Sequence, residues 1–217
     1  MKEPRHYSNE VTSGVLHLIG AVSALALLVI MIVFASLYGT AWHVVSFTIY
    51  GVFMMLLYLA STLYHLVPHR KVVTKDILQR IDHAMVYLFI AATYTPVAFI
   101  VLFGWERWFV FFLLWTLAIL GAVVKLVKIK LHGVVPVVLY VTMGWIIVFF
   151  WSSLIENMES MARIFLVLGG VSYTIGVIFF ALEAIFIPRK YFWMHEIFHI
   201  FVLLGTVSHT VVMFYLL

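Results

Sequence analysis

Three short stretches of the sequence place histidines beside hydroxyl or carboxylate side chains at spacings that suit metal chemistry. Ser61 and His65 are four residues apart, His195 and His199 are four residues apart, and Asp82 begins a third apolar stretch. Residues four apart lie on one face of an α-helix, so His195 and His199 can bind a single ion. The sequence contains no cysteine, so a metal held here would have only histidine and carboxylate ligands.

Three neutral imidazoles, from His65, His195 and His199, are typical of a zinc ion whose fourth position stays open to water. Such open sites are catalytic, because zinc acidifies the water and polarises a carbonyl. Asp82 is expected to be a catalytic residue that accepts the proton of the water, and Ser61 is expected to hydrogen-bond the water or a substrate carbonyl. The alternative for each histidine taken singly is a place among lipid head groups, where it donates to a phosphate or to a neighbouring carbonyl.

The composition is that of a chain embedded in a membrane. Of the 217 residues, 65% are hydrophobic and 10% are charged, and the mean hydropathy is +1.16. Soluble domains carry about 25% charged residues, so a water-soluble fold is excluded. The net charge of +4 does not indicate nucleic-acid binding, because the basic residues are spread between apolar segments.

Apolar runs between charged or turn-forming residues predict an all-α chain of seven transmembrane helices that forms one domain over residues 1–217. The predicted spans are 15–36, 42–65, 81–103, 108–127, 134–152, 162–186 and 194–216. Pro96 falls inside the third span, where we expect a kink that neighbouring helices tolerate. The first run is too long for the apolar core of a signal peptide, so we expect a retained helix.

The positions of the lysines and arginines predict the orientation of these spans. Of the 13 basic residues, all but Arg107 and Arg163 would lie on one side. By the positive-inside rule, the N-terminus is expected in the cytoplasm and the C-terminus outside. The three groups of candidate residues then fall together at the cytoplasmic ends of the second, third and seventh spans, although only lysines and arginines determine the predicted orientation.

Other polar residues near the same ends have less defined roles. Ser13 is expected to cap the first helix, while His17, with Glu10 before it, could lie beside the metal ligands. Glu183 is expected to pair with either Arg189 or His17. The remaining histidines are expected at the membrane interface or in packing: His6, His43, His69, His132 and His209.

Taken together, these motifs resemble those of the hemolysin III proteins, the bacterial branch of the progestin and adipoQ receptor (PAQR) family, which includes the adiponectin receptors. The resemblance covers nearly the whole chain, from Glu10-Val-Thr-Ser13 with His17, through Ser61-x-x-x-His65 and Asp82-His83, to His195-x-x-x-His199. It implies seven helices with a cytoplasmic N-terminus. It also implies zinc bound by the three histidines at 65, 195 and 199, with the aspartate and the serine near the zinc-bound water.

The resemblance leads to three hypotheses about function. Relatives of the broader group include alkaline ceramidases, which implies a zinc-dependent hydrolase of a lipid amide or ester, without establishing turnover. It would act at the cytoplasmic leaflet of a bacterial plasma membrane, with membrane lipids as its partners. The second hypothesis is a non-enzymatic sensor or regulator of lipid or membrane homeostasis with a structural zinc. The third is a cytolytic protein, although the helices lack the amphipathic character of a secreted pore former.

Overall fold

The computed structural model describes residues 7–129, 135–183, 185–186 and 192–217. Within these ranges the chain is built almost entirely of helices, and seven helical spans are long and apolar enough to cross a membrane. Both the all-α class and the number of spans are therefore confirmed, and the chain is a multi-pass membrane protein.

The order of the helices follows the predicted order of the spans. The first two spans are α1 (Tyr7–Tyr38) and α2 (Ala41–Leu66); the third is α3 (Val72–Pro96) with a π-helical turn over Val97–Val101; the fourth is α4 (Gly104–Leu126). The fifth consists of α5 (Val135–Trp145), a 3₁₀ segment (Ile146–Phe150) and α6 (Trp151–Asn157). The last two are α7 (Ser160–Leu182) and α8 (Met194–Tyr215).

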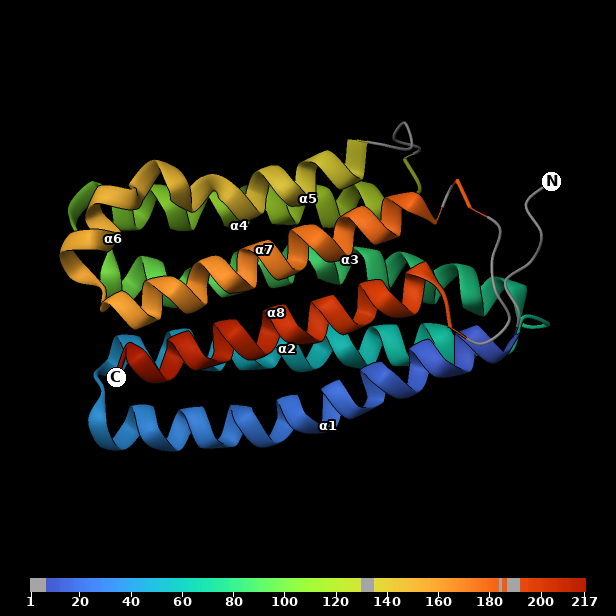
Figure 1. Ribbon diagram of the computed structural model, residues 1–217, viewed down its shortest axis with the longest axis horizontal. Coiled ribbons are helices and arrows are strands. Elements are labelled where there is room, and N and C mark those ends of the chain that lie inside the picture. The colour runs from blue at the N-terminus through green and yellow to red at the C-terminus, as the bar shows by residue number, and fades with distance from the viewer. Residues whose placement is uncertain (1–6, 130–134, 184, 187–191) are drawn as a thin grey trace.

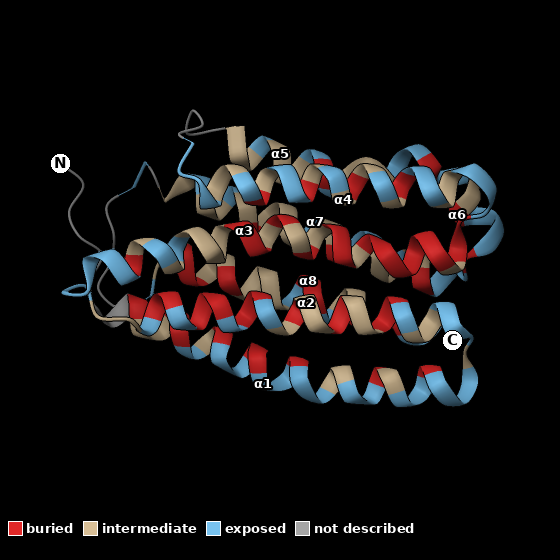
Figure 2. Cartoon of the chain, turned by 180° about the vertical axis from the view of Figure 1, so that it is seen from behind, coloured by how far each residue is buried: buried red, intermediate tan, exposed pale blue. Residues whose placement is uncertain are grey.

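The helices lie in two rows, and their axes all follow the long axis of the bundle (Figure 1). One row contains α2, α3 and α4, the other contains α8, α7 and α5, and α1 lies at the edge against α2 and α8. Seen from behind, exposed residues follow the outer face of α1, whereas α2 and α3 carry many buried residues (Figure 2). The exposed positions include large apolar side chains such as Val22, Phe112 and Ile164, as expected of a surface that faces lipid.

Two helices extend beyond their apolar spans at the same end of the bundle. α1 begins at Tyr7 instead of residue 15, and α3 begins at Val72 instead of residue 81. Polar residues make up much of both extensions, so hydropathy assigns them to loops. Glu10 and Lys75, one from each extension, are nevertheless buried. Each extension therefore brings one charged side chain inside the bundle.

The third and fifth spans each contain a change from regular α-helix to another helix type. A kink is expected at Pro96. The structure has a change in helix type there: α3 ends at Pro96 and the π-helical turn follows directly. Proline lacks an N–H and crowds the preceding turn, which favours such a change. In the fifth span, the Tyr94 hydroxyl donates to the Gly144 carbonyl (2.7 Å) and accepts from the Ile147 N–H (3.1 Å). A side chain of α3 thus pairs with backbone groups at this break.

A buried hydrogen-bond network joins α8 to α2 and α7. Thr206 Oγ1 donates to the Val202 carbonyl (3.0 Å) and accepts from the Tyr58 hydroxyl (2.6 Å). Its third contact is with the Tyr173 hydroxyl (2.9 Å). Because the Thr206 hydrogen is used by Val202, both tyrosines donate to the same oxygen. Thr206 is therefore the point at which three helices are tied together.

Thr206→Val should destabilise the fold, because the substitution removes the oxygen that two buried tyrosine hydroxyls use. Each unsatisfied buried hydroxyl costs about 1–3 kcal/mol, so the midpoint of thermal unfolding in a fixed detergent should fall by several degrees. The control is Thr48→Val, since among the described residues the Thr48 hydroxyl donates to the Val44 carbonyl of its own helix and joins no second helix. Equal midpoints for the two variants would contradict the role given to Thr206.

Candidate metal centre

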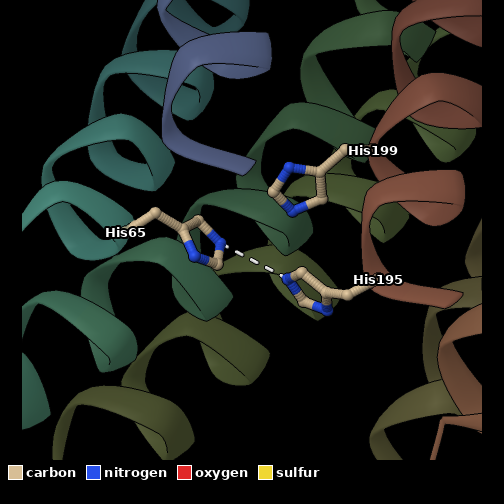
Figure 3. A group of neighbouring side chains, drawn as sticks. All are labelled: His65, His195 and His199. Carbon is tan, nitrogen blue, oxygen red and sulfur yellow. Dashed lines mark hydrogen bonds between the residues drawn. The ribbon is translucent and has the colours of Figure 1, made fainter. Parts of the chain in front are cut away.

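Three histidines meet where α2 ends and α8 begins (Figure 3). His65 comes from the last turn of α2, and His195 and His199 come from the start of α8. The three rings point toward one another, all are buried, and one nitrogen from each lies within 4.8 Å of the others. The described part of the chain thus contains a group of imidazoles that could hold a metal ion, made of the residues that the spacing indicated.

Two carboxylates orient two of the rings. His65 Nδ1 is 2.9 Å from Glu10 Oε2, and His195 Nδ1 is 3.0 Å from Glu183 Oε2. Because a carboxylate accepts, each ring donates its Nδ1–H and carries a lone pair on Nε2. This is the tautomer and the supporting contact that metal-binding histidines usually have.

The Nε2 atoms of His65 and His195 face each other at a distance that suits a cation bound between them. His65 Nε2 and His195 Nε2 are 3.3 Å apart (Figure 3). When both rings donate from Nδ1, neither Nε2 has a hydrogen for the other, and two lone pairs at this distance repel. Two nitrogens bound to a tetrahedral zinc ion, each ~2.0–2.1 Å from the metal, would be about 3.3 Å apart. The donor set therefore fits a zinc ion.

The third ring is oriented by stacking. The ring of His199 lies parallel to that of His17 on α1, with centroids 3.7 Å apart and planes 9° apart. The Nδ1 atom of His199 makes no regular hydrogen bond within the described residues, and its ring interacts with the backbone of Ser13. His199 therefore depends on α1 for its orientation, as His65 does.

One face of α1 supports the whole cluster. Glu10, Ser13 and His17 are three and four residues apart and so lie on one side of the helix. Ser13 Oγ donates to Glu196 Oε1 (2.9 Å), and Glu196 Oε2 accepts from the backbone N–H of Trp193 (2.7 Å) at the start of α8. Ser13 lies well inside α1, so the expectation that it caps this helix is wrong. It ties α1 to the helix that carries two of the histidines.

A buried lysine supports Glu10 in turn. Lys75 Nζ is 3.1 Å from Glu10 Oε2, and it donates to the carbonyls of Tyr64 (3.2 Å) and Val67 (3.3 Å) at the end of α2. A cation at a helix C-terminus is itself stabilising. The sequence reasoning placed Lys75 in a loop. Its four-residue spacing from Gln79, which donates to the Tyr64 hydroxyl, is the helical signal that could have placed it correctly.

Three further polar residues, Glu183, His43 and His209, contact groups on other segments of the chain. Glu183 contacts His195, not His17, and Arg189 lies outside the described residues. His43 Nε2 donates to the Leu216 carbonyl (2.9 Å), and His209 Nε2 donates to the Leu166 carbonyl (3.2 Å). These two histidines connect helices, in agreement with the packing roles expected of them.

A cavity of about 160 Å³ runs from the cluster into the bundle. Five polar residues line it near the cluster: His17, Ser61, Asp82, His83 and His199. Much of the remaining lining is apolar and includes Leu57, Phe89, Val177, Phe198 and Val202. A neighbouring hollow of about 330 Å³ shares part of this lining between α3, α5 and α7. The structure thus brings the aspartate and the serine that the sequence singled out into one space with a candidate ligand.

Comparison with known proteins gives a consistent result. Residues 5–210 match the family model described as "Haemolysin-III related". The chain is 39% identical to the "Hemolysin-3 homolog" of Bacillus subtilis (strain 168) over 199 residues, which cover 92% of this chain and 90% of the relative. It is 39% identical to "Hemolysin-3" of Bacillus cereus over 209 residues, with coverages of 96% and 92%. Similarity at 29% over 175 residues, covering 77% and 68%, to the "Monocyte to macrophage differentiation factor" of Homo sapiens fits the wider PAQR family. The chain therefore belongs to the hemolysin III family of membrane proteins.

Proposed function

We propose that this protein is a zinc-dependent hydrolase that cleaves an amide or ester bond of a lipid. One observation carries the proposal: a buried three-histidine cluster and an apolar cavity meet at one place, and Ser61 and Asp82 line the cavity there. Metal ligands alone would suit a structural site. A largely apolar cavity that begins at a candidate ligand favours chemistry on an amphiphile.

His65, His195 and His199 would hold the zinc ion. When bound, zinc polarises a carbonyl and makes water more acidic, so that hydrolysis can proceed near neutral pH. Glu10 and Glu183 keep two of the rings in the ligating tautomer, and His17 keeps the third ring in its plane.

Asp82 and Ser61 would carry the proton transfer and the charge stabilisation. Asp82 takes a proton from the attacking water and later delivers it to the leaving amine or alcohol. Ser61 donates a hydrogen bond to the carbonyl oxygen, where negative charge develops in the transition state. Both line the cavity, whose apolar wall would hold the acyl chains and exclude bulk water.

The positions of the basic residues support a cytoplasmic location for the cluster. α1, α3 and α8 begin, and α2 ends, at one end of the bundle (Figure 1). Lys75 and Arg80 near the start of α3, and Lys125 at the end of α4, lie at this end, whereas Arg107 and Arg163 lie at the starts of α4 and α7. By the positive-inside rule, the cluster faces the cytoplasmic leaflet of a bacterial plasma membrane.

Asp82→Asn tests the proposed chemistry. The variant should keep its zinc but lose hydrolysis by about 100-fold or more, because general acid–base catalysis contributes about 10²–10⁴-fold. We would measure bound zinc and fatty-acid release from a ceramide, an N-acylethanolamine and an acyl ester, with protein reconstituted in lipid vesicles.

Asp76→Asn is the matched control. Asp76 lies on the same helix, but it is partly exposed and pairs with Arg80 (3.0 Å) and Lys128 (2.9 Å). This variant should hydrolyse at the wild-type rate. Full activity in Asp82→Asn would exclude Asp82 as the base. Wild-type protein that holds zinc and releases no fatty acid would favour a structural zinc in a membrane sensor or regulator.

A further inference from the structure

His17 is a buried imidazole whose ring supports His199 but whose two nitrogens hydrogen-bond to none of the candidate ligands. The side chain is 4% exposed, and neither ring nitrogen makes a hydrogen bond to any described residue. The three nitrogens that share a centre come from other residues, so His17 is not a member of that group. One face of its ring is covered by His199, and the ring of Tyr58 meets it edge-on at 5.1 Å between centroids.

The ring of His17 lies on the wall of the cavity. It lines that space together with Ser61, Asp82 and His199. A neutral imidazole has one donor and one acceptor on its edge, and native structures rarely bury such groups without partners. Aromatic neighbours satisfy neither nitrogen. The cavity is therefore the place from which a hydrogen-bonding partner can reach the ring.

We propose that His17 binds the polar head of the lipid, through a hydrogen bond to the amide, ester or hydroxyl group beside the bond that is cleaved. That the ligand is a lipid amide or ester rests on the proposed function. Binding of such a lipid by His17 does not require that the protein hydrolyse it. An amphiphile suits the cavity because Leu57, Phe89 and Val202 contribute to its apolar wall. His17, Ser61 and Asp82 line the same cavity as the candidate ligand His199 and offer polar contacts to a head group. His17 would then select lipids by their head group, and the wall would hold any acyl chain.

The experiment measures binding of two brominated probes to purified protein in detergent. One is an N-acylethanolamine with bromine on its acyl chain, and the other is a brominated alkane of the same chain length without a head group. Trp145 lines the cavity, so bromine in the cavity should quench its fluorescence. Trp145→Phe should abolish this quenching, which identifies the signal with the cavity.

His17→Phe keeps a ring that can stack on His199 and removes both nitrogens. The variant should keep its zinc and bind the amide about tenfold more weakly, the effect of one lost hydrogen bond. The alkane should bind both proteins equally. Unchanged amide affinity would overturn the proposal. So would loss of zinc from His17→Phe, because the nitrogens of His17, and not only its stacked ring, would then be needed to hold the metal.

His17→Gln gives a second, independent measurement if the phenylalanine variant does not fold. Glutamine supplies a donor and an acceptor without the ring, so its amide affinity should stay within about threefold of wild type. Weakening as large as that expected for phenylalanine would contradict a hydrogen-bonding role. Wild-type protein that binds the amide selectively but never cleaves it would refute the hydrolase and leave this assignment standing.

Discussion

His65→Ala, His195→Ala and His199→Ala should each purify with less than roughly a tenth of the zinc that wild-type protein retains. Each variant leaves two imidazoles where zinc needs at least three protein ligands. Loss of a supporting residue alone lowers metal affinity by about 10–100-fold, and loss of a ligand should cost more. The measurement is zinc per mole of protein after dialysis against a weak chelator in detergent.

Two histidines outside the cluster provide the controls for this experiment. His209→Ala removes a half-buried histidine from the helix that carries His195 and His199, and His69→Ala removes an exposed one. Both variants should keep wild-type zinc. A strong chelator should lower the unfolding midpoint of wild-type protein but not of the three cluster variants, because bound metal stabilises only a fold that binds it. Wild-type protein without metal, or equal zinc in all variants, would contradict the assignment.

The transmembrane spans could be predicted because the bilayer imposes a simple rule on the sequence, about 20 apolar residues per crossing. The same rule fails where a helix leaves the apolar layer. The extensions that carry Glu10 and Lys75 are helical and each buries one of these charged residues, whereas hydropathy averages over all sides of a helix. Periodicity, instead of average hydropathy, is the signal for such segments.

His195 and His199 could be predicted as a pair because four-residue spacing within one helix places them on one face. His65, on another helix, could be added because the expected topology places the end of its span at the same depth. The supporting contacts could not be predicted. Glu10 with His65 and Glu183 with His195 join different segments, and such pairs depend on how the helices are rotated and on their relative depth. The stacking of His17 on His199 depends on the same variables. The sequence indicated these residues as polar groups in the right region, but not their partners.

Glu10→Ala should lower zinc affinity and stability for two separable reasons. Glu10 Oε2 accepts from His65 Nδ1 (2.9 Å) and from Lys75 Nζ (3.1 Å). Loss of the carboxylate that orients a ligating histidine costs about 10–100-fold in metal affinity. The substitution also leaves the ammonium of Lys75 buried without its counter-charge, and breaking a buried ion pair costs about 3–5 kcal/mol. Competition with a chromophoric chelator measures the first effect, and thermal unfolding of the metal-free protein measures the second.

A double variant that also removes the ammonium of Lys75 distinguishes the effect on zinc affinity from the effect on stability. Glu10→Ala/Lys75→Met should recover most of the lost stability, because no unpaired buried charge remains and the methionine fills the space of the lysine chain. Zinc affinity should stay low, because His65 still lacks its acceptor. Asp76→Ala/Lys128→Met, which removes a partly exposed ion pair from the same end of the bundle, should change neither quantity. Wild-type zinc affinity in the Glu10/Lys75 double variant would mean that Glu10 serves only to neutralise Lys75, and that His65 needs no carboxylate to bind the metal.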